Sequence, residues 1–141
     1  MHAEGALQER RLDPLIVEVA AGLIQDAIGR YLITQRRSGT HLAGLWEFPG
    51  GKRQAGETLE ACLHRELGEE LDGRIEVGEK VETVRWRYPG KTMIIHFYRC
   101  RLESGSIAPR EDQAMAWVAP EHLAEYEFPP ADAALIARLL Q

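Results

Sequence analysis

The chain has 141 residues, of which 45% are hydrophobic and 28% are charged, and its formal net charge is -5 at pH 7. A chain of this length forms one domain with a sizeable core, and the composition is that of an ordinary soluble globular protein. The acidic balance argues against binding to polymeric nucleic acid, whose affinity comes largely from Lys and Arg on phosphates. A small anionic ligand is compatible with it where metal ions and local cations provide shielding.

The chain carries no sign of a membrane or secreted protein. No apolar run approaches the roughly 20 residues that span a bilayer, and the N-terminal segment lacks the apolar centre of a signal peptide. Only two cysteines occur, Cys62 in a predicted helix and Cys100 in a predicted strand. We therefore expect two buried reduced thiols rather than a disulfide framework, and a cytoplasmic protein without a membrane partner.

Residues 1–13 are polar and without pattern, which predicts a flexible N-terminal extension before a single domain over residues 14–141. After Pro14, "LIVEVAAGLI" predicts a buried strand, "QDAIGR" a turn around Asp26 and Gly29, and "YLITQRR" a second strand of a hairpin. The next segment, "SGTHLAGLWEFPGG", is too rich in glycine for us to expect regular structure. Its apolar residues indicate a packed, functional loop.

The first predicted helix begins after Thr58, a plausible N-cap, and ends at Asp72-Gly73, with Gly73 in the left-handed position. "VETVRWRY" and "TMIIHFYRCRL" predict two strands joined by a turn at Pro89-Gly90-Lys91. "SGSIAPREDQA" predicts a loop, "MAWVAP" a short strand and "EHLAEY" a helical turn or two. "FPPADAALIARLL" predicts a final helix that turns Leu135, Ile136, Leu139 and Leu140 to one side. This order predicts an α/β (or α+β) sandwich around one mixed sheet.

The first helix carries three crowded carboxylates, Glu66, Glu69 and Glu70. Like charges at this spacing cost a few tenths of a kcal/mol per pair. On a helical wheel the leucines sweep an arc of roughly 120°; Glu70 falls inside that arc, Glu66 at its edge and Glu69 about 60° beyond. One interpretation is an ordinary surface helix rich in glutamate. The other is a site for a hard divalent cation, Mg²⁺ or Mn²⁺, which would offset the desolvation of these carboxylates.

The same residues resemble a known motif. Gly51, Glu57 and the run Arg65-Glu66-Leu67-Gly68-Glu69-Glu70 are similar to the Nudix box, G-x5-E-x7-R-E-U-x-E-E-x-G-U with U apolar. The last two positions depart, since Asp72 stands where the box has glycine and Gly73 where it has an apolar residue. We interpret this as a turn glycine shifted by one place.

The segments "LWEFPGGK" and "FPPAD" look like the MutT subgroup of Nudix hydrolases, the nucleoside triphosphate pyrophosphohydrolases. The resemblance implies the Nudix fold, a mixed sheet between helices. It also implies Mg²⁺-dependent hydrolysis of a nucleoside triphosphate to the monophosphate and pyrophosphate, with Mn²⁺ as a substitute for Mg²⁺. The protein would act as a monomer or homodimer.

The resemblance also implies roles for individual residues. The metal ligands would be the backbone carbonyl of Gly50 and the carboxylates of Glu66, Glu69, Glu70 and Glu111. Glu111 is alternatively a solvated loop residue. Arg65 would orient the box carboxylates with Glu57 as its partner, and an exposed pairing with Glu69 is the simpler alternative. The identity of the general base stays open, because it differs among Nudix enzymes.

The residues expected to bind substrate are Arg36, His41, Phe48, Lys52, Lys91 and Asp132. His41 is alternatively a loop residue packed on Trp46, Lys91 a solvated turn residue, and Asp132 a helix-start residue favoured by the helix dipole. In the MutT enzyme that acts on oxidised guanine, the place of Asp132 holds an asparagine that reads the purine edge. An ionised Asp only accepts hydrogen bonds, whereas Asn also donates them.

The base therefore stays open at this point. The first hypothesis is a sanitising hydrolase for modified nucleoside triphosphates, 8-oxo-dGTP foremost. The second is the same chemistry on CTP, dCTP or 5-methyl-dCTP. A non-catalytic Nudix-fold nucleotide-binding module is the alternative from another class, and the retained box carboxylates argue against it. A dinucleotide-polyphosphate or ADP-ribose hydrolase is a further option that the "FPPAD" segment disfavours.

Overall fold

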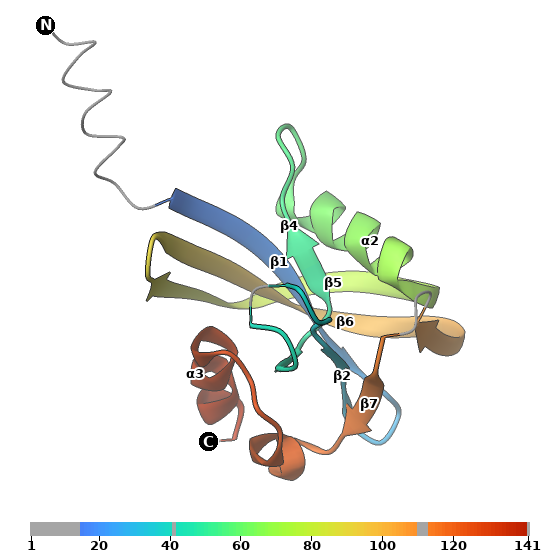
Figure 1. The fold of residues 1–141 in the computed structure, drawn as a ribbon. Coiled ribbons are helices and arrows are strands. Elements are labelled where there is room, and N and C mark those ends of the chain that lie inside the picture. The colour runs from blue at the N-terminus through green and yellow to red at the C-terminus, as the bar shows by residue number, and fades with distance from the viewer. Residues whose placement is uncertain (1–14, 41, 110–112, 141) are drawn as a thin grey trace, which may run out of the picture.

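A computed structural model describes residues 15–40, 42–109 and 113–140, so the predicted N-terminal extension lies outside the described residues. In chain order the elements are β1 (Leu15–Gln25), β2 (Tyr31–Gln35), β3 (Trp46–Glu47), β4 (Gly50–Lys52), α2 (Leu59–Glu70), β5 (Leu71–Tyr88), β6 (Lys91–Pro109), β7 (Met115–Val118), the 3₁₀ helix η1 (Pro120–Glu125) and α3 (Pro130–Leu139). Figure 1 shows α2 on one face of the strands and η1 with α3 on the other. This is the layered mixed architecture that the sequence predicts.

The sheet is mixed, with strand order β3-β2-β1-β6-β5, and β4 pairs with β1 while β7 pairs with β2. The central strands β1 and β6 are parallel and pair over the whole length of β1, from Leu15 opposite Lys91 to Gln25 opposite Arg101. The antiparallel strands β5 and β6 form a long hairpin that turns at Pro89-Gly90, where Gly90 has a φ of +81°. Such a positive φ favours glycine, as a tight turn requires.

Helix α2 covers one face of the sheet. Its N-cap is Thr58, whose hydroxyl accepts a hydrogen bond from the Ala61 N–H at 3.1 Å. The helix buries Cys62, Leu63 and Leu67 against strand residues that include Ala20 and Tyr98. Both cysteines are buried free thiols, as predicted.

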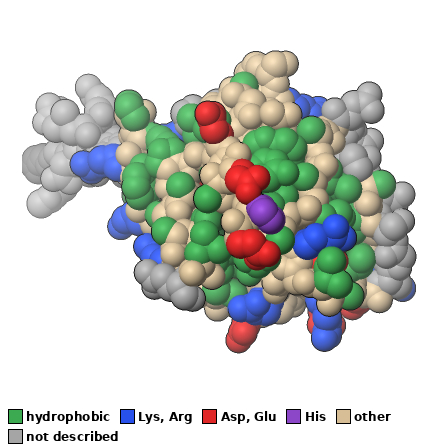
Figure 2. Space-filling view, turned by 90° about the horizontal axis from the view of Figure 1, so that it is seen from below, with side chains coloured by type: hydrophobic (Ala, Val, Ile, Leu, Met, Phe, Trp, Pro, Cys, Tyr) green, Lys and Arg blue, Asp and Glu red, His purple; other side chains and the backbone are tan. Residues whose placement is uncertain are grey.

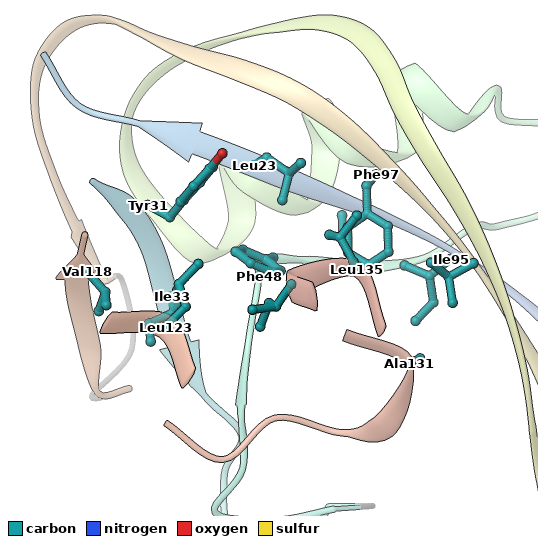
Figure 3. Close-up of a cluster of buried hydrophobic side chains, with 13 residues drawn as sticks. Leu23, Tyr31, Ile33, Phe48, Ile95, Phe97, Val118, Leu123, Ala131 and Leu135 are labelled. Atoms are coloured by element: carbon teal, nitrogen blue, oxygen red, sulfur yellow. The ribbon is translucent and has the colours of Figure 1, made fainter. Parts of the chain in front are cut away.

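The opposite face packs against η1 and α3 around Phe48, which is 3% exposed. Figure 3 shows Phe48 in the middle of this cluster, between Ile33 and Leu123 on one side and Leu135 and Phe97 on the other. The Phe48 ring contacts two strand aromatics edge to face, with centroids 6.1 Å from those of Tyr31 and of Phe97. The segment between β3 and β4 is therefore fixed by the core.

Figure 2 shows the outer surface on this side, where hydrophobic side chains gather among scattered charged ones. Residues of η1, of α3 and of the segment between them line a shallow cavity of about 680 Å³ there, together with Leu45 and Leu140. Among the residues that the structure describes, no helix is long and apolar enough to cross a membrane.

Four sequence predictions need correction. Helix α2 ends at Glu70 and continues without a turn into β5, so Gly73 is a strand residue and does not cap the helix. The glycine-rich segment before the box contains the two short strands β3 and β4, because it pairs with β2 and β1. The predicted loop "SGSIAPREDQA" begins as strand, since β6 extends to Pro109. Leu140 lies beyond α3 and is 44% exposed, so it is not part of the buried side.

Candidate active site

Two glycines of β4 let the chain pass closely between β1 and α2. A Cβ on Gly50 would lie 2.0 Å from the carbonyl oxygen of Ala20, so only glycine allows β4 to pair with β1 here. A Cβ on Gly51 would lie 2.3 Å from Cδ of Glu66. The box glycine therefore makes room for a carboxyl group of the helix that follows it.

Arg65 connects the loop before α2 with the helix itself. Its Nε and Nη2 donate hydrogen bonds to the two carboxylate oxygens of Glu57, at 2.9 and 2.7 Å. Its Nη1 lies 2.9 Å from Oε1 of Glu66 and 3.4 Å from Oε1 of Glu69. The hydrogen bonds from Arg65 are the main cause that lowers the pKa of Glu57 to about 2. The predicted partner Glu57 and the alternative partner Glu69 are both in contact with Arg65, and Glu57 has the better geometry.

The three box carboxylates differ in their surroundings. Glu69 is 60% exposed in its side chain, whereas Glu66 is 18% exposed. The Oε2 atom of Glu70 is buried and has no hydrogen-bond partner. Burial, followed by the negative charges of Glu47 and Glu66, raises the pKa of Glu70 to about 8, and burial also raises the pKa of Glu66.

A divalent cation suits this donor set, although its ligands do not converge in the structure. Among the described residues, no three His, Cys, Asp or Glu side chains lie together in a metal-binding arrangement. Arg65 instead binds Glu66 and Glu69, and Glu70 keeps a buried oxygen without a partner. A buried carboxylate oxygen without a hydrogen-bond partner, beside like charges, is the kind of hard oxygen ligand that Mg²⁺ binds. The carboxylates of Glu66, Glu69 and Glu70 therefore fit Mg²⁺. The further predicted ligand, Glu111, lies outside the described residues.

A cavity of about 340 Å³ opens beside β4, on the side of the sheet that carries Phe48. Its polar lining includes Asp132, which is 6% exposed. Burial is the main cause that raises the pKa of Asp132 to about 8, and the negative charge of Glu47 adds to it. Five other residues expected from the sequence line the same cavity: Arg36, Phe48, Gly50, Lys52 and Lys91.

A second cavity, of about 240 Å³, lies next to it and is lined by Glu69 and Glu70 of α2 together with Arg37 and Gln113. The two cavities share Arg36, Thr40 and Glu47. The Nη1 atom of Arg36 lies 2.6 Å from Oε1 of Glu47. An apolar cavity with a buried carboxyl group thus adjoins an acidic one, with an ion pair between them. We name them the base cavity and the acidic cavity.

The structure brings together all the predicted site residues that it describes, and His41 lies outside the described residues. The sequence reasoning missed Glu47, which lines both cavities, and also Tyr88 and Met93 of the base cavity. A signal for Glu47 was present, because a carboxylate stands between Trp46 and Phe48 in an otherwise apolar run. Nothing local marked Tyr88 or Met93, which reach the cavity from β5 and β6.

Known proteins support the family assignment. The NUDIX domain family matches residues 20–138. The 8-oxo-dGTP diphosphatase of Haemophilus influenzae is 42% identical over 129 residues, covering 92% of this chain and 95% of that relative. The CTP pyrophosphohydrolase of Escherichia coli is 36% identical over 121 residues, covering 86% and 89%.

Solved structures agree in fold. The solution structure of the E. coli ORF135 protein matches with a TM-score of 0.75 and 33% identity, over 90% of each chain. The crystal structure of the MutT protein from Methanosarcina mazei Go1 matches with a TM-score of 0.81 over 89% of this chain and 94% of that one. At 22% identity this second likeness shows the fold alone. The chain therefore belongs to the NUDIX domain family, which confirms the prediction of a MutT-like Nudix pyrophosphohydrolase with a mixed α+β fold.

Proposed function

We propose that this protein hydrolyses modified nucleoside triphosphates, 8-oxo-dGTP foremost, to the monophosphate and pyrophosphate. One observation carries the proposal: the base cavity and the acidic cavity adjoin and share Arg36 and Glu47. A nucleotide could occupy both cavities at once, with its base beside Phe48 and Asp132 and its phosphates toward α2. Nucleotide pockets combine an apolar lining with a few placed polar groups in this way.

Divalent cations would be held by Glu66, Glu69 and Glu70 and by the Gly50 carbonyl, with Glu111 as a further ligand. Mg²⁺ supplies charge stabilisation on the phosphate oxygens and lowers the pKa of an attacking water. Glu57 and Arg65 would position these carboxylates through the hydrogen bonds already described. Lys52 and Lys91 would offset the phosphate charge that an acidic chain otherwise repels.

Asp132 supports an oxidised purine as the first candidate. With a pKa raised to about 8, its carboxyl group is mostly protonated at pH 7. A protonated carboxyl offers a donor beside an acceptor, as an asparagine amide does. This pairing suits a purine edge that presents both kinds of group. The relative of highest identity given above is named 8-oxo-dGTP diphosphatase.

The same chemistry on CTP, dCTP or 5-methyl-dCTP is the second candidate. The observation that favours it is the E. coli relative named CTP pyrophosphohydrolase, at 36% identity. A non-catalytic nucleotide-binding module is disfavoured because the box carboxylates Glu66, Glu69 and Glu70 are all present.

The proposal also covers the domain organisation, the oligomeric state and the cellular location of the protein. We propose that residues 14–141 act as one Nudix domain, active as a monomer or homodimer. A cytoplasmic location fits the two buried free thiols, Cys62 and Cys100, because that compartment keeps thiols reduced.

The test is a set of initial rates with Mg²⁺ against 8-oxo-dGTP, dGTP, CTP, dCTP, 5-methyl-dCTP and ADP-ribose, with the products resolved. We expect pyrophosphate release, with kcat/KM for 8-oxo-dGTP well above that for dGTP. A preference for the cytidine nucleotides would make the second candidate correct. If the protein turned over none of them, the proposal would be wrong.

A further inference from the structure

Glu47 lies at the boundary between the two cavities and lines both of them. It belongs to the short strand β3, which pairs with β2, so its backbone is held by the sheet. Its side chain is 19% exposed, and its carboxylate oxygens lie 2.6 and 3.3 Å from Nη1 of Arg36. The Glu47 carboxylate therefore binds the guanidinium of Arg36, which faces the space proposed for the nucleotide.

Glu47 is also an electrostatic neighbour of both ends of the site. Burial is the main cause that raises the pKa of Glu70 on the acidic side and of Asp132 on the base side, and the negative charge of Glu47 is the next cause in both. A phosphate that enters between the cavities meets this same negative charge. Glu47 thus opposes an anionic ligand twice, by its own charge and by its hold on Arg36.

A phosphate must compete with Glu47 for the guanidinium of Arg36. Charge-assisted hydrogen bonds of this kind are the strong ones, and a guanidinium binds carboxylate and phosphate in the same geometry. The competition favours the phosphate only when another positive charge compensates Glu47. The buried oxygen of Glu70 in the adjoining wall, which has no hydrogen-bond partner, is where such a positive charge would bind.

We propose that Glu47 makes nucleotide binding depend on the divalent cation. Without a cation in the acidic cavity, Glu47 retains Arg36 and repels phosphate. When that cavity is neutralised, Glu47 releases Arg36 to the phosphate. This inference rests on the proposed function, because it assumes that a nucleotide occupies the two cavities. Glu47 is a positioning residue here, since it acts through Arg36.

The dependence must be reciprocal. If Mg²⁺ tightens nucleotide binding by some factor, the nucleotide tightens Mg²⁺ binding by the same factor. Removing the charge of Glu47 reduces that factor, because the metal-free protein then binds nucleotide more tightly. This sign separates the proposal from a simple loss of a ligand, which would weaken binding.

The experiment measures the dissociation constants of 8-oxo-dGMP and dCMP by calorimetry, in Mg²⁺ and in EDTA, without turnover. We expect Glu47→Gln to bind nucleotide in EDTA about fivefold or more tighter than the unchanged protein, a gain of about 1 kcal/mol. The ratio between the two conditions should shrink accordingly. The matched control is Glu18→Gln, which removes a carboxylate that also pairs with an arginine, Arg53 at 2.9 Å, but lines neither cavity.

A second variant tests whether Arg36 carries the effect. In an Arg36→Gln background, Glu47→Gln should no longer tighten metal-free binding, because the two residues act on one another. A gain that persists there would mean a general charge effect and would overturn the proposal. Unchanged or weaker metal-free binding in Glu47→Gln, or no nucleotide binding to the unchanged protein in Mg²⁺, would also overturn it. Turnover of the triphosphates by the unchanged protein tests the proposed function separately.

Discussion

Arg65 donates two hydrogen bonds to Glu57, a residue of the loop that precedes its own helix, at 2.9 and 2.7 Å. A third contact runs from Nη2 of Arg65 to the backbone carbonyl of Lys52, at 3.3 Å. Glu57 in turn accepts a hydrogen bond from the N–H of Gln54 at 2.8 Å. The arginine thereby fixes the distance between β4, the loop and α2, which together carry the proposed metal ligands.

We expect Arg65→Lys to lower kcat by about tenfold to a hundredfold, the cost of a small misplacement of catalytic groups. Lysine keeps the charge but cannot bind Glu57 through two parallel hydrogen bonds while reaching Glu66. Steady-state kinetics with Mg²⁺ would check this. The control is Arg138→Lys, because Arg138 pairs with Glu82 at 2.7 Å and both residues lie outside the two cavities. Equal losses in the two variants would argue against a special role for Arg65.

Glu70→Gln should lower turnover by about a hundredfold to a thousandfold, the usual cost of removing one group that stabilises transition-state charge. The fold should survive, because the substitution keeps the shape of the side chain and removes a carboxyl group whose charged form is opposed by burial and by the charges of Glu47 and Glu66. Turnover and thermal unfolding measured on the same sample would separate the two effects. Near-normal turnover would refute a metal site on α2.

Gly51→Ala should displace the carboxyl group of Glu66, since the added Cβ would lie 2.3 Å from its Cδ. We expect weaker activation by Mg²⁺, measured as a higher half-saturating concentration, with a correctly folded protein by circular dichroism. The end of a flexible side chain can move aside, so stability should change less than activity.

Gly68→Ala is the matched control, and we expect it to stabilise the protein rather than to impair it. Gly68 lies within α2, and a Cβ there would meet no atom within 4 Å beyond its chain neighbours and the backbone of its own helix. Alanine in an exposed helix position is worth about 0.5 to 1 kcal/mol over glycine. Denaturant unfolding should show this gain with unchanged Mg²⁺ activation. A loss of activation in Gly68→Ala comparable to that of Gly51→Ala would contradict the steric argument.

Asp132→Asn should stabilise the metal-free protein at high pH. The folded chain retains the Asp132 proton up to a pKa of about 8, whereas the unfolded chain loses it near the ordinary value of 3.8. The contribution of Asp132 to stability is therefore present below about pH 4 and is lost as the pH rises through 8. Because one pKa unit corresponds to about 1.4 kcal/mol, we expect the variant to be at least about 1 kcal/mol more stable at pH 8.

Chemical denaturation in EDTA at pH 4, 6 and 8 would follow that difference. The difference in the free energy of unfolding between the variant and the unchanged protein should be small at pH 4 and grow with pH. A difference that is constant across this range would mean that Asp132 titrates normally despite its burial.

Much of the fold could be predicted, because hydrophobic pattern and turn residues are local. The strands around Ile24, Ile33 and Phe97 and the helix that starts after Thr58 lie where the sequence predicts them. The errors arose where pairing overrides local preference. Residues 46–47 and 50–52 form strands because β2 and β1 pair with them, and β6 reaches Pro109 because β5 continues to Leu71 opposite it.

The site was predictable where one motif on one helix carries it. Glu66, Glu69 and Glu70 stand at fixed helical spacing, so the sequence alone placed them together. Glu47 was missed because its importance comes from tertiary neighbours: Arg36 on one side, and Glu70 and Asp132 on the other. The burial of Asp132, which changes its protonation, likewise depends on contacts that no local pattern reveals.

The direct passage from α2 into β5 has a consequence for how this site tolerates change in chain length. Leu71 is at once the residue whose N–H bonds to the Leu67 carbonyl at the end of the helix and the first strand residue, opposite Pro109. Between Glu70 and the sheet there is thus no loop that an insertion could lengthen. One added residue would either turn the last carboxylate by about 100° around the helix axis or shift β5 by one place and reverse which of its side chains face the core. The spacing of the acidic residues is therefore tied to the register of the edge strand, and the two can change only together.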